Sequence, residues 1–216
     1  MVLAGNFSGE RLFESVVAAI NTQSSITYYM VSRSGVAGEE SAKVQSTMVR
    51  AGGGSGYIYH QNNQYYVSMA TYLDKSSAEA VAAKNKDTVV IELTLSLNEV
   101  YDLSIDNDFL KEVIKYMQDA LMVLDDAIIK YAKSEMQTGE VLSKLEAERN
   151  KLFDLKSRLI DAACEGRDAL INTIDPMFGG LEAIVSAGSP NGLLSSMRYV
   201  QTAGVVSLCS LGNLDD

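Results

Sequence analysis

The side chains that could carry out catalysis are few in this chain and lie far apart. His60 is the only histidine, and it falls in a run that predicts a β-strand. A nucleophilic triad or a histidine-based zinc site needs companion residues, and neither Cys164 nor Cys209 is close to it in sequence. We therefore expect no catalytic histidine and no zinc site.

Acidic pairs occur at Asp125-Asp126 and at Glu146 and Glu148. Paired carboxylates can serve as general acid and base in hydrolysis. These pairs, however, lie on segments whose apolar spacing predicts helices, and charged residues beside such a stripe are typical of a solvated helix face. We expect a protein that is not an enzyme and that holds no cofactor or metal.

A glycine cluster spans Gly52 to Gly56. A phosphate-binding loop of the P-loop type follows a strand, precedes a helix and carries a Lys-Ser/Thr pair. Here a predicted helix precedes the cluster, a predicted strand follows it, and the Lys-Ser/Thr pair is missing. The cluster is therefore interpreted as a helix stop followed by a turn.

The cysteines and the hydropathy pattern place few limits on the compartment. Cys164 and Cys209 share no metal-ligand spacing, so they are interpreted as two buried thiols, with a disulfide between them as the alternative. No apolar run reaches 18 residues, and no signal peptide is visible. We expect any membrane attachment to come from an anchor outside this sequence.

Charge divides the chain near Ser96. The formal net charge is −10. Residues 27–95 hold equal numbers of acidic and basic residues, whereas almost all of the excess negative charge follows Ser96. We expect an N-terminal amphipathic helix and linker over 1–26, one domain over 27–95 and a helical bundle over 96–216. An acidic chain repels phosphate backbones, which argues against nucleic acid as a partner.

Residues 27–95 contain a tandem repeat. A shift of 36 positions places Tyr29 on Tyr65, Val31 on Val67 and Ser41 on Ser77. Each copy begins with an alternating aromatic run that predicts a strand, and continues into a helical run. The full set of elements is strands at 28–33, 57–60, 65–72 and 89–95, with helices at 38–51 and 77–84. This order predicts an α+β fold, with a four-stranded antiparallel sheet, both helices on one face and the other face open.

Heptad spacing dominates the second half of the chain. Apolar residues repeat every three or four positions from Leu110 to Tyr131 and again from Val141 to Ala162. The short break between them predicts an antiparallel helical hairpin. Asp175-Pro176 is expected to stop the second helix. A third helix is predicted from Leu193 to Leu208.

Tyrosines are concentrated in the repeat, which holds seven of the eleven. A tyrosine ring can stack on a sugar while its hydroxyl forms a hydrogen bond, so a tyrosine-bearing sheet face suits a polyhydroxylated ligand. The alternative is that tyrosine favours strands and that these rings pack in the core. Either Tyr57 and Tyr59 or Ile58 and His60 face the two helices, and the pattern favours Tyr57 and Tyr59.

The repeat resembles the SPOR (sporulation-related repeat) domain, a peptidoglycan-binding module of bacterial division and sporulation proteins. The resemblance lies in the segment Tyr29 to Val36 followed by Glu40-Ser41-Ala42, and it recurs in Tyr66 to Ala70 with Ser76-Ser77-Ala78. It implies that glycan strands bind to the sheet face without helices. The residues it places on that face are Tyr28, Met30, Ser32, Tyr66, Ser68 and Ala70, and strand alternation then places Val31, Val67 and Met69 in the core.

Three hypotheses follow. The first is a cell-wall-binding module of a division or sporulation protein, held on the extracytoplasmic face of the membrane. The second is a SPOR-like scaffold whose acidic helical hairpin binds a protein partner or self-associates. The third is a small-molecule regulatory domain on the same two-helix sandwich.

Overall fold

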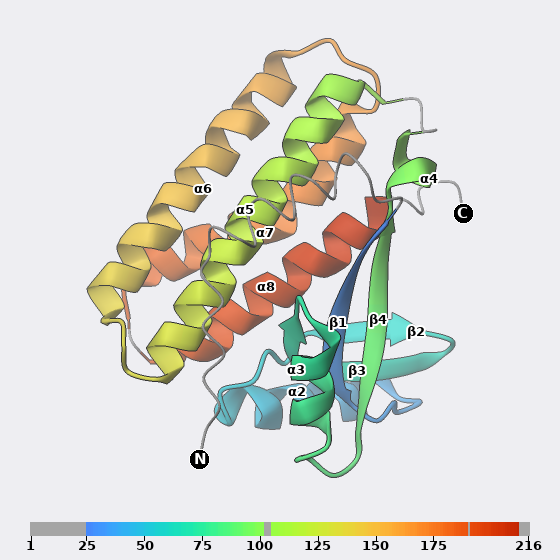
Figure 1. Cartoon of the computed structure of the whole chain (residues 1–216), viewed down its shortest axis with the longest axis vertical. Coiled ribbons are helices and arrows are strands. Elements are labelled where there is room, and N and C mark those ends of the chain that lie inside the picture. The colour runs from blue at the N-terminus through green and yellow to red at the C-terminus, as the bar shows by residue number, and fades with distance from the viewer. Residues whose placement is uncertain (1–24, 102–104, 190, 212–216) are drawn as a thin grey trace.

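The chain folds as a four-stranded antiparallel sheet with helices on both faces, as Figure 1 shows. The computed structural model describes residues 25–101, 105–189 and 191–211. The helix expected near the N-terminus lies outside the described residues. In chain order the elements are β1 (Ser25–Arg33), α2 (Glu39–Ala51), β2 (Ile58–Gln61), β3 (Gln64–Tyr72), α3 (Lys75–Ala82), β4 (Thr88–Ser96), α4 (Leu97–Tyr101), α5 (Asn107–Ala132), α6 (Thr138–Asp161), α7 (Arg167–Ala187) and α8 (Leu193–Ser210).

The predicted α+β class, sheet and helical bundle are confirmed. The strand order is β2-β3-β1-β4, and all three neighbouring pairs are antiparallel. The hairpin between β2 and β3 turns at Asn62 and Asn63, whose φ angles are 51° and 58°. Asparagine tolerates this left-handed conformation well, and two such residues form the turn whose twist matches paired strands.

A β-bulge in β3 changes which residues share a face. Val31 lies opposite Ala70, but the next residue of β1, Ser32, lies opposite Ser68, so Met69 is the extra residue. Residues directly opposite each other point to the same face of a sheet. Ala70 therefore shares a face with Val31, and its predicted place beside Ser68 on the glycan face is wrong.

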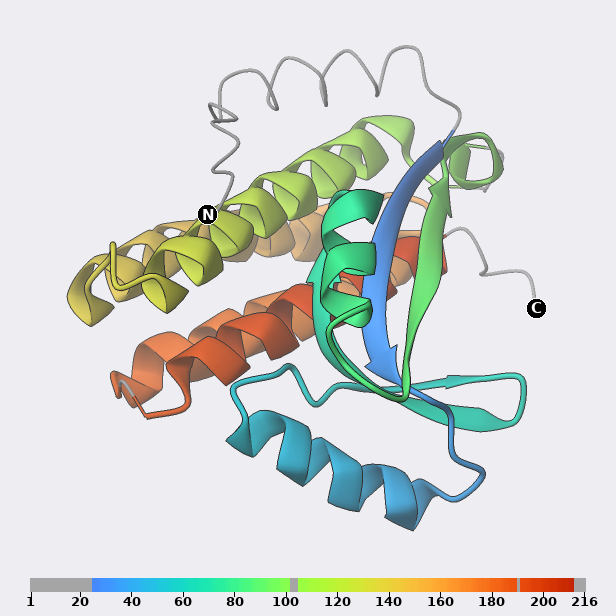
Figure 2. The same cartoon turned by 60° about the horizontal axis from the view of Figure 1, so that its bottom comes forward.

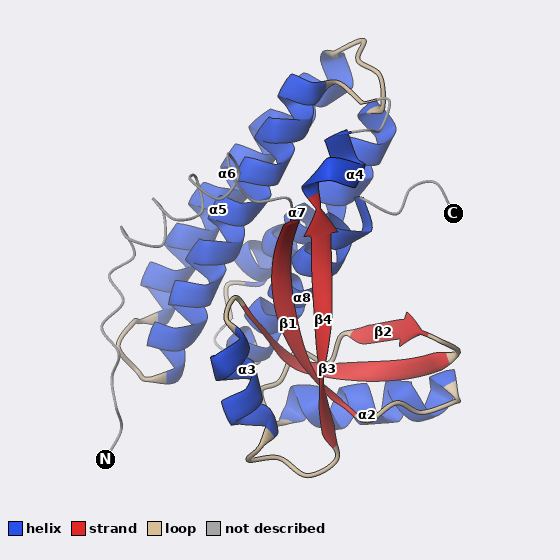
Figure 3. Ribbon diagram, turned by 45° about the vertical axis from the view of Figure 1, so that its right-hand side comes forward, coloured by secondary structure: helices blue, strands red, loops and turns tan. Residues whose placement is uncertain are grey.

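Helices α2 and α3 cover one face of the sheet (Figure 3). Val31, Val67, Ala42 of α2 and Ala78 of α3 are fully buried there. The small alanine side chains allow the helices to approach the strands closely. Asp74 caps α3, because its carboxylate accepts a hydrogen bond from the Ser77 amide at 2.9 Å.

The four long helices α5 to α8 form the bundle, with one correction to the predicted ends. Helix α6 ends at Asp161, and α7 then runs straight through Pro176. Proline cannot donate to the carbonyl of Asn172, four residues earlier. The Ser207 hydroxyl of α8 lies 3.4 Å from that carbonyl and donates to the carbonyl of Thr173 at 2.9 Å. Packing against α6 and α8 holds α7 along its length, so the proline does not end the helix.

Helix α8 is the predicted third helix, and it lies between the sheet and the rest of the bundle (Figures 1 and 2). Its residues are buried on nearly all sides, as expected of a helix enclosed by packing. One continuous apolar core joins Tyr28, Met30 and Leu95 of the sheet to Leu121 of α5 and Val205 of α8. The sheet and the bundle therefore share a single hydrophobic core.

Candidate functional site

The sheet face predicted to bind glycan is buried beneath the bundle. Tyr28, Met30, Ser32 and Ser68 are each at most 3% exposed, and Ala70, on the opposite face, is 6% exposed. Tyr66 alone among the six is half-buried. The expectation of an open face is wrong because α8 packs against β3 and β4 where a ligand would have to stack.

Hydrogen bonds hold α8 on this face. The Thr202 hydroxyl donates to the carbonyl of Arg198 at 2.9 Å, which leaves its oxygen free to accept from Thr71 of β3, also at 2.9 Å. The Ser68 hydroxyl lies 3.4 Å from the same oxygen. These hydroxyls are buried, and each unmade hydrogen bond there would cost stability. These hydrogen bonds therefore fix the position of α8 on the sheet.

The glycine cluster contributes acceptors to the same contact. Ser195 donates to the carbonyl of Gly54 at 2.7 Å, and Arg198 donates to the carbonyl of Gly53 at 2.8 Å. Gly53 has a φ of 82°, a conformation that glycine adopts without strain. The predicted helix stop is confirmed, since α2 ends at Ala51 and Gly52 caps it. No residue pattern near the glycine cluster predicts that α8 packs on this loop.

Burial raises the pKa values of two ionisable groups in the core between α8 and the sheet. Burial raises the pKa of the Tyr28 hydroxyl above its ordinary value, with the Cys209 thiol adding to the rise, while a hydrogen bond from Gln118 opposes it. Burial also raises the pKa of the Cys209 thiol to about 12. Both groups stay protonated at neutral pH, and neither Tyr28 nor Cys209 is available to a ligand.

The remaining candidates for chemistry are dispersed. His60 lies at the surface with its ring 4.5 Å from that of Tyr65. Asp126 forms ion pairs with Lys130 and Lys144. Over 25–101, 105–189 and 191–211, no three His, Cys, Asp or Glu side chains gather as a metal site.

Cys164 and Cys209 are both free thiols, so the disulfide alternative is wrong. Among the helices that the structure describes, none is both long and apolar enough to cross a membrane.

The β2–β3 hairpin carries the tyrosines that remain accessible. Tyr66 donates from its hydroxyl to the Gln64 side chain at 3.0 Å. Tyr57 does not face α2 and α3 as predicted, because its ring lies 5.5 Å from that of Tyr199 in α8. Tyr59, opposite Tyr66, packs against the core that the sheet shares with the bundle. The favoured phase of this strand is therefore wrong, and the alternative agrees with the structure, because Ile58 lies opposite the buried Val67.

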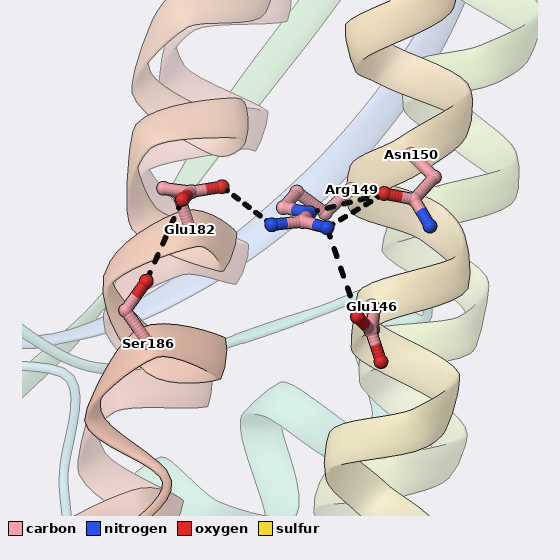
Figure 4. Close-up of polar contacts among 5 residues, drawn as sticks. All are labelled: Glu146, Arg149, Asn150, Glu182 and Ser186. Atoms are coloured by element: carbon pink, nitrogen blue, oxygen red, sulfur yellow. Dashed lines mark hydrogen bonds and ion pairs between the residues drawn. The ribbon is translucent and has the colours of Figure 1, made fainter.

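A second surface lies where α6 and α7 meet on the outside of the bundle. The antiparallel helices bring Arg149 against Glu182 at 2.9 Å, Phe153 against Phe178 with ring centroids 6.1 Å apart, and Lys156 against Asp175. Figure 4 shows Arg149 reaching Glu182 across the helices while it also contacts Glu146 and Asn150. We call this row of contacts, together with Ile160 one turn beyond Lys156, the α6–α7 seam.

The α6–α7 seam exposes apolar side chains. Phe153 and Ile160 are each 54% exposed, and they stand seven residues apart on one side of α6. Together they give the outer side of α6 an apolar stripe that is open to solvent. The sequence did contain the signal, because Phe153 and Ile160 keep heptad spacing outside the buried stripe of α6.

Comparisons with known proteins identify no relative. No family model, no curated protein and no solved structure matches this chain.

Proposed function

We propose that the chain is a non-catalytic protein-interaction module in which a SPOR-like sheet supports an acidic helical bundle. The α6–α7 seam is the surface that binds the partner. One observation carries the proposal. Helix α8 covers the sheet face, whereas Phe153 and Ile160 remain exposed on the bundle.

The chemistry of the seam defines the partner. Phe153 and Ile160 supply an apolar stripe about two helical turns long, which suits the apolar face of an amphipathic helix. The cations Arg149 and Lys156 are already paired within the seam, whereas Asp154 and Asp161 are exposed and form no ion pair among the described residues. The partner is therefore a helix whose apolar side is flanked by Lys or Arg.

A pair of double variants tests this proposal. Phe153→Ser with Ile160→Ser removes the apolar stripe, and Val44→Ser with Met48→Ser removes a comparable exposed pair from α2. Proteins captured from an extract of the source organism are identified, and the purified partner is titrated against each variant. We expect the seam variant to lose at least tenfold in affinity, because exposed aromatic anchors dominate such contacts. Equal affinity of both variants would contradict the proposal.

Ionic strength provides a second readout. Because the partner's cations meet a surface of net negative charge, we expect affinity to fall as salt rises from about 0.05 to 0.5 M. An affinity independent of salt would exclude a basic partner.

Glycan binding at the β2–β3 hairpin is a second candidate function. It is favoured by Tyr66, which stays accessible and is oriented by Gln64, next to the exposed amides of Gln61, Asn62 and Asn63. Aromatic rings beside amide groups suit a polyhydroxylated ligand. This role requires placement on the extracytoplasmic face of the membrane, in a division or sporulation protein.

Binding to purified sacculi, before and after amidase removes the stem peptides, tests the second candidate. Tyr66→Ala is expected to abolish binding to the denuded glycan. Tyr199→Ala, which removes an exposed tyrosine from α8, is expected to leave it unchanged. Failure of the unmodified protein to bind denuded glycan rules this candidate out.

A further inference from the structure

Strand β4 stands at one margin of the sheet with one side unpaired (Figure 3). It pairs with β1 over nine consecutive residues, from Thr88 opposite Arg33 to Ser96 opposite Ser25, without a shift in register. On its other side, none of the strands that the structure describes pairs with it. A row of backbone donors and acceptors is therefore left without strand partners along this margin.

β4 lacks the features that normally prevent edge strands from pairing. Between Thr88 and Ser96 there is no lysine, arginine, proline or glycine, and Glu92 is the single charged residue. The strand has no bulge, and it is rich in branched residues that favour strands. The opposite margin differs, because β2 spans only four residues. The unprotected edge of β4 is thus a template for another strand.

We propose that β4 pairs antiparallel with β4 of a second copy of this chain, joining two sheets into one of eight strands. The two-fold axis passes through Leu93, so that Leu93 faces its counterpart. Glu92 then lies opposite Thr94 of the second copy, and Ile91 lies opposite Leu95. An axis through Glu92 would oppose two like charges, and an axis through Ile91 would oppose Glu92 to an apolar valine.

The net charge of residues 27–95 allows two β4 strands to approach each other. Residues 27–95 are electrically neutral overall, so the acidic character of the bundle does not extend to the sheet margin. Glu92 is also partly neutralised within its own copy, because Lys75 lies 2.9 Å away. With a two-fold axis perpendicular to the sheet, both bundles lie on one face of the eight-stranded sheet and both pairs of helices α2 and α3 lie on the other. This arrangement leaves both α6–α7 seams free. The pairing is independent of the proposed partner surface.

Two substitutions at one position test the register. Thr94 is exposed, and its hydroxyl lies 3.1 Å from that of Thr27, so either change leaves the core intact. Thr94→Glu places a second carboxylate opposite Glu92, and Thr94→Lys places a cation there. Because each pair occurs twice in the dimer, we expect Thr94→Glu to raise the dimer dissociation constant about 3- to 10-fold and Thr94→Lys to lower it by a similar factor. Sedimentation of the full chain over a range of concentrations measures both constants.

Every outcome bears on the proposal. A concentration-dependent dimer with opposite responses to the two substitutions, and slower amide hydrogen exchange in β4 at high concentration, supports it. A strict monomer overturns it, as does a dimer that responds equally to both changes. A dimer lost in the Phe153→Ser, Ile160→Ser variant overturns it too, and assigns self-association to the bundle instead.

Discussion

The hydroxyl of Thr202 in α8 accepts a hydrogen bond from the hydroxyl of Thr71 in β3, and the two residues are 131 positions apart in the chain. Both side chains are buried. This contact fixes a helix from the end of the chain on the sheet built near its beginning. With the apolar core that α8 shares with the sheet, it keeps the second sheet face in the interior.

Replacing Thr202 with valine tests the strength of that contact. Valine keeps the shape of threonine but leaves the Thr71 and Ser68 hydroxyls without their partner in a buried setting. We expect the free energy of unfolding to fall by about 1–3 kcal/mol, measured by urea denaturation. Thr202→Ser should restore most of the loss. The exposed pair of Thr27 and Thr94 is the matched control, since Thr27→Val is expected to change stability by less than about 0.5 kcal/mol. Equal costs at both sites would refute a structural role for the buried pair.

Two adjacent glycines in α7 are expected to respond to alanine with opposite signs. A Cβ at Gly180 would collide with the branched side chain of Val200 in α8, whereas a Cβ at Gly179 would meet nothing within 4 Å. Gly180→Ala should therefore destabilise by about 1–3 kcal/mol, because α7 and α8 must separate. Gly179→Ala should stabilise by up to about 1 kcal/mol, because alanine favours a helix. Thermal or urea unfolding measures both, and the same sign at both positions would show that the packing of α7 on α8 differs from the one described.

Alkaline pH is expected to destabilise the fold through Cys209. In the unfolded chain this thiol ionises near its ordinary pKa of 9.0, whereas in the fold burial raises the pKa to about 12. A raised folded pKa gives stability that is complete below pH 9 and is lost as pH rises toward 12. Urea midpoints should decline over this window in the unmodified protein.

Cys209→Ala is the corresponding variant. It should decline less steeply between pH 9 and 10, where the loss linked to the second buried group, Tyr28, is still smaller because its ordinary pKa of 10.0 lies above that of the thiol. Parallel curves for the two proteins would exclude this thiol as the source of the loss.

Asp125 is expected to limit stability at neutral pH. Burial raises the pKa of this carboxyl, the Asp126 carboxylate adds to the rise, and a hydrogen bond from Gln201 opposes it. The stability linked to its protonated form is therefore present below its unfolded pKa, and is lost as pH rises through the folded value. Asp125→Asn should raise the melting temperature at pH 7, and the difference should shrink toward pH 3.

The neighbouring Asp126 is the control for this prediction. Its carboxylate pairs with Lys130 and Lys144 at the surface, so Asp126→Asn should lower stability slightly, by at most about 1 kcal/mol. A stabilising effect of equal size at both positions would point to the net charge of the chain and away from burial.

Local patterns predicted the elements well. The alternating run that contains Tyr28 to Arg33 is part of β1, and the heptad from Leu110 lies in α5. The errors have specific causes. Pro176 stays inside α7 because packing against α6 and α8 overrides the local tendency of proline to end a helix, and Ala70 changes face because Met69 forms a bulge. Neither cause is visible in the residues nearby.

The sequence by itself determined the order of strands and helices, the acidic bundle and the scarcity of catalytic residues, because each depends on residue type and short-range spacing. Only the tertiary structure determined that the predicted glycan face is buried. The apolar stripe of Leu193 to Leu208 is equally consistent with a third helix of a separate bundle and with one that also covers the sheet. Only the packing of α8 against β3 and β4 decided between them, since burial on both sides of one helix depends on contacts such as Ser68 with Thr202, more than a hundred residues apart.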